Sequence, residues 1–397
     1  MRILVLTPTF LPALGGAELV VFQIYRRLAC NHSVLILTPY LSKKILENNS
    51  STDYDHLINF DVERYKDRYS FMKLRGHRVT LGLIPPFSLS AVSATMQAVR
   101  SFKPDVLNVH YVMPTGLAGF YAQKILKIPT VITYNGRDVS GPGVPKLWKY
   151  WHRLIGLNCS EMTFVSKYCH NVIYGSENKD GNVIYNGVED PKNVTNDQIV
   201  ALKSKLQINK DEIVLFGLQR LDSLKRVDIL IKSMQIILRQ KSKVRLIIGG
   251  KGEDMPRLMK LAEKLKISKY IVFAGFIPDK EIPAYYAISD LFVFHSTYET
   301  FGMVLAEAMN YGKAIVSVSN TAISEVVDNG KTGLLVPTLD YKAFANAVLK
   351  LLNNEERRNE IGRIGYEKVQ EFFKWNAIAS QYETVLKSAI TSEPILK

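Results

Sequence analysis

The stretch that decides the fold of this 397-residue chain is His295-Ser296-Thr297-Tyr298-Glu299-Thr300-Phe301-Gly302-Met303-Val304-Leu305-Ala306-Glu307-Ala308-Met309. Residues 291–294, directly before it, are all apolar, as expected for a strand buried on both faces of a parallel sheet. Residues 303–309 are good helix formers. The stretch therefore predicts a strand, a loop and a helix of an open α/β sheet, which binds ligands at the carboxyl ends of its strands.

Two carboxylates stand in this unit, Glu299 in the loop and Glu307 in the helix. A helix that begins near Phe301 would separate them by about 10 Å along its axis, so one ligand as long as a nucleotide sugar could contact both. Gly302 has no side chain at the point where backbone N–H groups of the helix N-terminus would face that ligand. Taken alone, the pair is equally well explained by a loop acid and a solvated helix acid.

Strand and helix signals alternate along most of the chain, and the expected strands are residues 2–7, 34–37, 79–83, 106–110, 130–134, 162–165, 182–185, 213–217, 245–248, 271–274, 291–295, 314–318 and 334–336. The chain is too long for one ordinary core. We therefore predict an α/β protein with two Rossmann-like domains whose parallel sheets face a central cleft. The predicted boundaries are 1–190 for the N-terminal domain, 191–211 for a polar linker, 212–370 for the C-terminal domain and 371–397 for a closing helix.

Composition and charge restrict the class of partner. A chain that is 47% hydrophobic and 22% charged is typical of a soluble globular protein, and no stretch has the length of a membrane span. Three scattered cysteines without metal-ligand spacing favour reduced thiols in a cytosol. The net charge of +14 favours an anionic partner: nucleic acid, an anionic membrane or a phosphorylated substrate. The chain lacks nucleic-acid-binding signatures, so we expect no nucleic acid partner.

Polar residues also follow predicted strands of the N-terminal half. Gly15 and Gly16 precede a predicted helix and would let the backbone approach a phosphate, although a plain turn explains them as well. His110 ends one predicted strand, and Asn135 and Asp138 follow the next. Carboxyl ends of parallel strands meet at one crevice, so we expect these three side chains to lie near each other. Each alone is also explained as a loop or cap residue.

Two basic segments stand out in this half. Residues 41–78 are polar and mixed in charge and carry a run of Arg, Lys and His from Arg64 to Arg78, which we interpret as a solvated loop or hairpin rather than a binding patch. From Lys146 to Arg153, basic residues are interleaved with aromatic ones, as in a helix that lies in a membrane interface. A helix that packs its aromatic face on the sheet would give the same pattern.

In the C-terminal half, Arg220 and Lys225 flank a short loop between a strand and a helix. Two cations at that point suit a diphosphate, although they could also be solvated surface charges. Gly250 belongs to a glycine-rich turn, Gly249-Gly250-Lys251-Gly252, that would let the backbone approach a ligand. Residues 273–278, Phe-Ala-Gly-Phe-Ile-Pro, end a strand where backbone groups could contact a base edge.

The order of these motifs resembles the retaining glycosyltransferases of family 4, over nearly the whole chain and most strongly from residue 213 to 337. The resemblance implies a GT-B fold, an acceptor-binding N-terminal domain, a C-terminal domain that binds the nucleotide-sugar donor, and a last helix that crosses back to the N-terminal domain. It implies that Arg220 and Lys225 hold the donor diphosphate. Glu299 would contact hydroxyls of the donor sugar, and Glu307 the ribose hydroxyls.

The resemblance assigns the remaining candidate residues too. Backbone N–H groups of Phe301, Gly302 and Met303 would face the phosphates, Gly250 would approach the donor, and Gly275 to Ile277 would lie beside the base. Gly15 and Gly16 would close over the diphosphate. The family is metal-independent, so we expect neither a metal nor another cofactor, and cations and N–H groups would stabilise the leaving group instead.

One position departs from the family pattern, which often has His-Gly-x-Asp where this chain has Asn135-Gly136-Arg137-Asp138. Asn cannot serve as an acid or base but can hydrogen-bond the donor. In a front-face retaining mechanism the departing diphosphate oxygen takes the acceptor proton, which makes Asn135 tolerable. The candidate catalytic residues are therefore Glu299, Asn135, His110 and Asp138.

We expect a glycosyltransferase that moves a hexose from a nucleotide diphosphate sugar to a hydroxyl acceptor. The basic aromatic segment favours a lipid-linked acceptor or a polysaccharide precursor and a cytoplasmic protein peripheral to the inner face of the membrane; a soluble acceptor stays open. A GT-B nucleotide-sugar epimerase and a catalytically silent sugar-nucleotide-binding scaffold are the alternatives.

Overall fold

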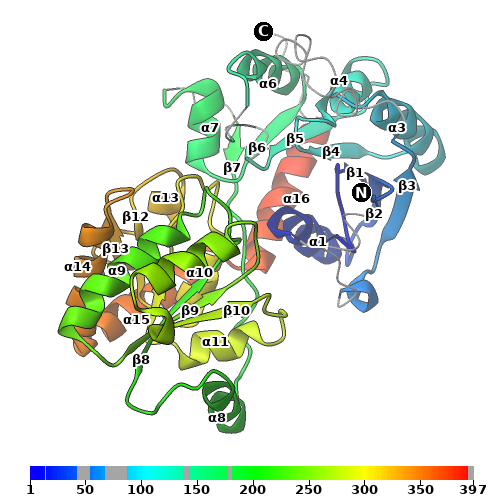
Figure 1. Cartoon of the computed structure of the whole chain (residues 1–397). Coiled ribbons are helices and arrows are strands. Elements are labelled where there is room, and N and C mark those ends of the chain that lie inside the picture. The colour runs from blue at the N-terminus through cyan, green and yellow to red at the C-terminus, as the bar shows by residue number, and fades with distance from the viewer. Residues whose placement is uncertain are drawn as a thin grey trace. The chain divides into compact units, whose positions relative to one another are not determined.

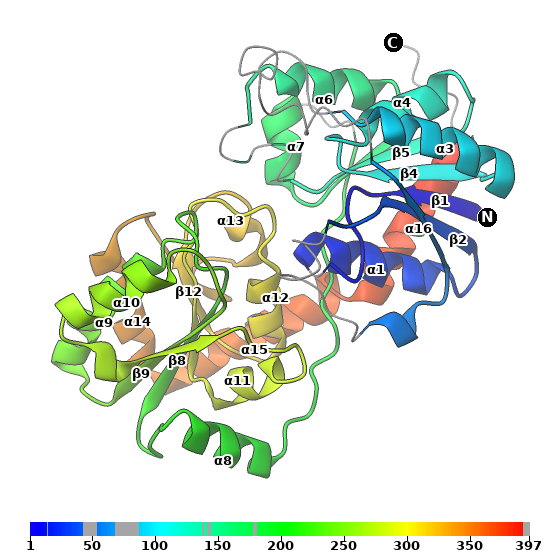
Figure 2. The same cartoon turned by 45° about the vertical axis from the view of Figure 1, so that its right-hand side comes forward.

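The computed structural model describes residues 1–13, 15–42, 54–67, 87–136, 139, 141, 144–177 and 181–391. The chain forms two compact units (Figures 1 and 2). Unit 1 comprises Met1–Asn186 and Trp375–Lys397, and unit 2 comprises Gly187–Lys374. Within the described residues, no helix combines the length and apolar character needed to cross a membrane.

The described part of unit 1 holds a seven-stranded parallel sheet in the order β3-β2-β1-β4-β5-β6-β7. Its strands are β1 (Arg2–Leu6), β2 (Ser33–Pro39), β3 (Asp61–Tyr65), β4 (Val106–His110), β5 (Thr130–Tyr134), β6 (Glu161–Phe164) and β7 (Asn182–Val183). Its helices are α1 (Gly16–Leu28), the short η1 (Asp55–Leu57), α3 (Leu89–Phe102), α4 (Gly116–Lys124), α6 (Trp148–Leu157), α7 (Lys167–Tyr174) and α16 (Trp375–Thr391).

Helices cover both faces of this sheet. α3 and α4 pack on one face, and α1 and α16 pack against each other on the opposite face (Figure 2). β1, β4 and β5 are almost continuously buried, as expected for central strands of a parallel sheet, and β4 and β5 also bury polar residues, among them Asn108, His110 and Thr133. This arrangement leaves the carboxyl ends of β4 and β5, with His110 and Asn135, beside each other.

Unit 2, every residue of which is described, has a six-stranded parallel sheet in the order β10-β9-β8-β11-β12-β13. Its strands are β8 (Ile213–Leu218), β9 (Val244–Gly249), β10 (Ile271–Gly275), β11 (Leu291–Val293), β12 (Ile315–Val318) and β13 (Gly333–Val336). Its helices are α8 (Asn196–Lys205), α9 (Val227–Gln240), α10 (Met255–Lys264), η3 (Ser268–Tyr270), α11 (Ile282–Ile288), α12 (Met303–Asn310), α13 (Ile323–Val326), α14 (Tyr341–Leu352) and α15 (Glu355–Phe372).

The order of strands in unit 2 reverses between β8 and β11, the two central strands. Chain connections leave these two strands in opposite directions, which opens a crevice at their carboxyl ends. The loop after β8 carries Arg220 and Lys225, and the loop after β11 carries Glu299. The topology therefore brings the two candidate loops of this unit to one point.

Three sequence-based expectations differ from the structure or fall outside it. Residues 61–65, predicted to lie in a solvated loop or hairpin, form the parallel edge strand β3, whose alternation of polar residues is that of an exposed edge. The stretch predicted as a linker, 191–211, contains helix α8, which has a capping box formed by Thr195 and Gln198 and packs on α11. The strand expected at 79–83 lies outside the described residues.

Candidate functional site

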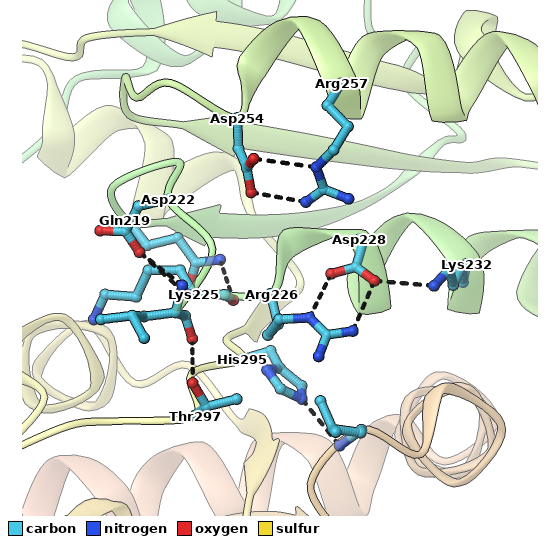
Figure 3. Close-up of polar contacts among 12 residues, drawn as sticks. Gln219, Asp222, Lys225, Arg226, Asp228, Lys232, Asp254, Arg257, His295 and Thr297 are labelled. Carbon is cyan, nitrogen blue, oxygen red and sulfur yellow. Dashed lines mark hydrogen bonds and ion pairs between the residues drawn. The ribbon is translucent and has the colours of Figure 1, made fainter. Parts of the chain in front are cut away.

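The loops that follow β8 and β11 are tied to each other by Thr297. Its backbone N–H and its hydroxyl Oγ1 both donate to the carbonyl oxygen of Leu224, at 2.8 and 2.9 Å, and Figure 3 draws the hydroxyl bond. Two bonds from one residue to one carbonyl fix the separation of the two loops. The residue after Leu224 is Lys225, and Glu299 lies two positions beyond Thr297.

Lys225 and Glu299 form an ion pair across these loops. Lys225 Nζ lies 2.5 Å from Glu299 Oε2, and the two side chains are 14% and 17% exposed. The Lys225 ammonium also lies 5.3 Å from the ring centroid of Phe294, where the aromatic face attracts a cation. The backbone of Glu299 is fixed because its N–H donates to Thr321 Oγ1 at 3.2 Å and its carbonyl accepts from Ala322 at 3.3 Å.

Arg220, the second candidate cation, is 61% exposed and pairs with Asp222 at 3.0 Å. Asp222 also accepts the N–H groups of Leu224 and Lys225, at 3.1 and 3.2 Å, through its other oxygen, Oδ1. The same carboxylate therefore shapes the turn before Lys225 and holds the guanidinium of Arg220. Most of that guanidinium faces solvent, where an anion can reach it.

The glycine-rich turn after β9 packs directly on the loop after β8. A Cβ atom added to Gly250, whose φ is 116°, would lie 1.9 Å from the carbonyl oxygen of Gln219. A Cβ added to Gly252 would lie 2.1 Å from the carbonyl oxygen of Leu221. These glycines are required by the close approach of two backbones within the protein, which brings the turn next to the loop that carries Arg220 and Lys225.

We expect Gly250→Ala to lower the free energy of unfolding by about 3 kcal/mol, because the new methyl group meets a backbone oxygen and the residue keeps a left-handed φ. Gly275→Ala is the matched control. Its φ is 69°, but an added Cβ would meet no atom within 4 Å, so strain alone should cost about 1 kcal/mol. Urea unfolding of both variants measures the difference; equal losses would contradict the packing argument.

Ile277 and Phe276, two of the residues expected beside the base, differ in exposure. Ile277 is buried, and its side chain packs against the backbone of Gly249. The exposed group is Phe276, at 57%, whose ring centroid lies 5.7 Å from Lys251 Nζ. Burial therefore leaves Ile277 only its backbone for the expected base contact, whereas the side chains of Phe276 and Lys251 reach the surface.

The N-terminus of α12 lies beside Glu299. Gly302 is its N-cap residue, with φ 91° and ψ 60°, and an added Cβ would lie 3.3 Å from Glu299 Cγ. Phe301 is buried and packs edge-on against Phe373 at 5.4 Å between centroids, so its contribution to any ligand is limited to its backbone. The first turn of α12, which begins at Met303, contains no acidic residue, and its N–H groups can donate hydrogen bonds to an anion.

Glu307 lies on α12 in a half-buried position. Tyr286 donates its hydroxyl to Glu307 Oε2 at 3.2 Å, and the Tyr286 ring stacks on Tyr311 at 5.0 Å between centroids. Burial raises the pKa of Glu307 to about 7, and the hydrogen bond from Tyr286 counteracts only part of that rise. The side chain therefore changes protonation near neutral pH.

In unit 1 the structure brings His110 and Asn135 together. Asn135 donates from Nδ2 to His110 Nδ1 at 3.3 Å, so the ring proton is on Nε2. Nε2 lies 3.3 Å from the hydroxyl of Tyr25, which in turn donates to Asn108. His110 is fully buried, and burial lowers its pKa to about 4, so the ring is neutral at pH 7. His110 is thus suited to orient Asn135.

The other candidates in unit 1 have different surroundings. Gly16 begins α1 and Gly15 is its N-cap residue. Glu18, in the first turn of that helix, accepts a hydrogen bond from Thr9, and its Oε2 lies 2.5 Å from where a Cβ on Gly15 would be. An acid therefore occupies the N-terminus that was expected to face a phosphate. Asp138, the remaining catalytic candidate, lies outside the described residues.

Several residues around the candidate site are not suggested by the sequence. Asp222 and Thr297 position the loops, and Tyr286 holds Glu307. Asp222 acts on residues two and three positions away, whereas Thr297 and Tyr286 act on residues that the fold brings near, 73 positions away for Leu224 and 21 for Glu307. Among the described residues, no three or more His, Cys, Asp and Glu side chains gather as a set that could hold a metal ion.

Comparison with known proteins assigns both units. The model for glycosyl transferases group 1 matches residues 199–368, and the model for Glycosyltransferase Family 4 matches residues 14–191. Among curated relatives, N-acetyl-alpha-D-glucosaminyl L-malate synthase of Bacillus anthracis is 26% identical and covers 95% of each chain. Alpha-monoglucosyldiacylglycerol synthase of Acholeplasma laidlawii is 28% identical and covers 84% of each.

Solved structures share the fold. The crystal structure of Anabaena Alr3699/HepE in complex with UDP and glucose superposes with a TM-score of 0.80 at 20% identity, over 98% of this chain and 100% of that one. Sucrose-phosphate synthase from Thermosynechococcus elongatus gives a TM-score of 0.79 at 20% identity, over 98% and 99%. Two parallel α/β units and two family models that together span most of the chain lead to one conclusion: it belongs to the family 4 glycosyltransferases and has the GT-B fold.

Proposed function

We propose that this glycosyltransferase transfers a hexose from a nucleotide diphosphate sugar to a hydroxyl acceptor with retention of anomeric configuration. The observation that carries the proposal is the shielded Lys225–Glu299 pair at the carboxyl ends of β8 and β11. It combines a cation suited to a diphosphate with a carboxylate suited to sugar hydroxyls. The relatives whose names mention a glucosaminyl or a glucosyl product support the same class of reaction.

In this proposal the donor diphosphate binds between Lys225, Arg220 and the N-terminus of α12. An ammonium has three N–H donors, so Lys225 can keep its bond to Glu299 and still reach a phosphate oxygen. Arg220 contributes a planar fork from the exposed side of the loop. Together these groups would stabilise the charge that develops on the leaving diphosphate, and we propose that neither a metal nor another cofactor is needed.

We further propose a front-face mechanism, in which the departing diphosphate oxygen takes the proton of the acceptor hydroxyl. Such a step needs no protein base. Asn135 would hydrogen-bond the donor, and neutral His110 would act through Asn135 because its own ring is buried. Two further roles stay proposals that rest on the family resemblance. Asp138 would be a catalytic residue, and Gly15 and Gly16 would close over the diphosphate.

We expect Glu307→Gln to raise the donor KM about tenfold and to change kcat less, because an amide oxygen accepts hydrogen bonds from the ribose hydroxyls more weakly than a carboxylate does. Since the pKa of Glu307 is about 7 in the free protein, the carboxylate is lost as the pH falls through that value. The wild-type donor KM should therefore increase as the pH is lowered from about 8 to about 6, and the KM of the variant should stay constant over that range. A larger effect on kcat than on KM would contradict the assignment.

Two alternatives are separated from the proposal by product analysis. A nucleotide-sugar epimerase would convert the donor without an acceptor, and a silent scaffold would bind the donor unchanged. Transfer or donor hydrolysis above background excludes the silent scaffold, an alternative suggested by the presence of Asn135 where the family often has His. A gain of turnover in Asn135→His would indicate that the amide limits catalysis.

The proposed function is tested by thermal unfolding with UDP-, GDP- and ADP-sugars, since a ligand that binds the native state raises the unfolding temperature. We expect one nucleotide to raise the unfolding temperature and the other two to have little effect. A panel in which none changes it would contradict the donor site. The names of four solved structures include UDP, three of Anabaena Alr3699/HepE and one of TarM, which makes UDP-sugars the first donors to test.

For the acceptor we propose a lipid-linked molecule at an anionic membrane. Trp151 packs inward, edge-on to Phe87, so the aromatic residues of the segment are partly used by the fold. Leu147, Tyr150 and Leu157 of the same helical region are exposed instead. Their spacing of three and seven residues places them along one side of the helix, next to the cations of the segment. We accordingly propose a cytoplasmic protein peripheral to the membrane.

We expect binding to phosphatidylglycerol-containing vesicles at low ionic strength and release as salt is added, because surface charges are screened. Tyr150→Ser should weaken binding several-fold, since an interfacial aromatic anchor is lost. The control is Tyr366→Ser, a change at an exposed tyrosine of α15 in unit 2. Failure to bind such vesicles at low salt would contradict membrane association.

A further inference from the structure

The residue after Lys225 has a backbone conformation that arginine rarely adopts. Arg226 has φ 43° and ψ 45°, in the left-handed region, and it is the N-cap residue of α9 without a side-chain capping bond. A Cβ atom makes this region unfavourable, whereas glycine adopts it readily. The position therefore suits glycine, and an arginine there needs contacts that hold it.

Asp228 supplies those contacts. The guanidinium of Arg226 donates to it twice, Nε to Oδ1 at 2.9 Å and Nη2 to Oδ2 at 3.1 Å (Figure 3). The Asp228 side chain is only 4% exposed, and its Oδ2 also accepts from Lys232 Nζ at 2.9 Å. Burial alone would raise the pKa of Asp228, but the hydrogen bonds and charges of Arg226 and Lys232 lower it to about 2. Asp228 is thus a charged, shielded anchor at physiological pH.

The other contacts of this loop act on the backbone at and before Lys225. Asp222 accepts the N–H of Lys225 at 3.2 Å, and Gln219 donates from Nε2 to its carbonyl at 3.4 Å. Thr297 holds the preceding carbonyl. The chain direction immediately after Lys225 depends on the dihedral angles of Arg226, which the bidentate bond to Asp228 stabilises.

We propose that Arg226 and Asp228 form a positioning clamp that holds the left-handed turn after Lys225 and so places the Lys225 ammonium for the donor diphosphate. The inference rests on the proposed function, because it concerns the site at which the donor would bind. Arg226 and Asp228 are positioning residues in this account: they act through Lys225 and touch no reacting atom. The contacts of the clamp stabilise Arg226 in the left-handed backbone conformation that glycine adopts without such contacts.

The decisive comparison is Arg226→Ala against Arg226→Gly. Both variants lose the guanidinium, but only glycine keeps the left-handed backbone without the clamp. We expect the alanine variant to bind the preferred nucleoside diphosphate about tenfold more weakly than the glycine variant does, the size of effect given by one misplaced charge-assisted hydrogen bond. Calorimetric titration with UDP, GDP and ADP measures this ratio.

Two further variants separate positioning from loss of structure. Asp228→Asn should weaken binding like Arg226→Ala, and adding Arg226→Gly to it should restore most of the affinity. In a Lys225→Met background, the alanine and glycine variants should bind alike, because the group that the clamp positions is gone. Lys232→Ala removes a cation from Asp228 but leaves both bonds to Arg226, so it is the charge-matched control and should bind like the wild type.

Each result decides the inference. If the wild type binds none of the three nucleotides, the proposed function fails and the clamp has no donor site to serve. If the wild type binds one of them and the alanine and glycine variants bind it equally, the clamp is refuted while the donor site stands. If both variants bind the nucleotide equally and more weakly than the wild type does, the guanidinium of Arg226 itself contacts the ligand. If a tenfold difference between the alanine and glycine variants persists in the Lys225→Met background, the difference comes from folding and not from the position of Lys225.

Discussion

Glu299→Gln is expected to lower kcat by about 100-fold while the affinity for the nucleoside diphosphate changes only a few-fold. Glu299 Oε2 lies 2.5 Å from Lys225 Nζ, and the side chain is shielded from solvent. The amide keeps the shape and can still accept a hydrogen bond, but it loses the charge that makes bonds to sugar hydroxyls strong. The effect of Glu299→Gln should therefore appear in kcat, in the step that transfers the sugar.

Steady-state kinetics at saturating donor measures this change, with calorimetry for the nucleotide. The control is Glu263→Gln, an isosteric change at an exposed residue of α10, which should leave kcat unchanged. Wild-type kcat in Glu299→Gln would refute a role for this carboxylate in turnover. A variant that loses nucleotide affinity and keeps kcat would reverse the roles assigned to Glu299 and Glu307.

Lys225→Met is expected to lower kcat/KM by about 1,000-fold, the larger of the two effects, because two losses combine. The diphosphate loses its cation, and the Glu299 carboxylate is left without its partner beside the phosphates, where it repels them. The affinity for the nucleoside diphosphate should fall together with kcat.

The double variant Lys225→Met/Glu299→Gln tests that reasoning. Removing the unpaired carboxylate should recover part of the nucleotide affinity lost in Lys225→Met, so the two changes should be non-additive. Lys232→Met is the matched control, since it removes another cation of the same unit from the neighbouring helix α9. Full additivity would indicate that the ion pair is not part of the donor site.

Rules about strand ends predicted much of the fold and of the candidate site. Buried apolar runs marked the central strands, and the β8 and β11 loops were chosen because ligands bind where such strands end. The GT-B fold and the family are confirmed. The edge strand β3 was missed because its polar sequence lacks the continuous apolar run that identifies central strands.

The side-chain pairings were beyond the sequence because they depend on tertiary packing. Nothing in the sequence indicates that the hydroxyl of Tyr286 donates a hydrogen bond to Glu307, or that burial raises the pKa of Glu307 to about 7. His110 was recognised as a strand-end polar residue, but its burial against Tyr25 and Tyr382 follows from helices α1 and α16, which are remote in sequence. The role proposed for Arg226 depends on its left-handed backbone conformation, which the sequence does not reveal.

The central claim is that unit 2 binds a nucleotide diphosphate sugar and that Glu299 and Lys225 act on it. The most direct measurement is the release of nucleoside diphosphate from UDP-, GDP- and ADP-hexoses, with alcohol-bearing lipid in anionic vesicles as acceptor, by the wild type and by Glu299→Gln. We predict that one donor is consumed, that the glycosidic product retains the donor configuration, and that the variant is about 100-fold slower. Consumption of none of these donors, or equal rates for the two proteins, would contradict the account.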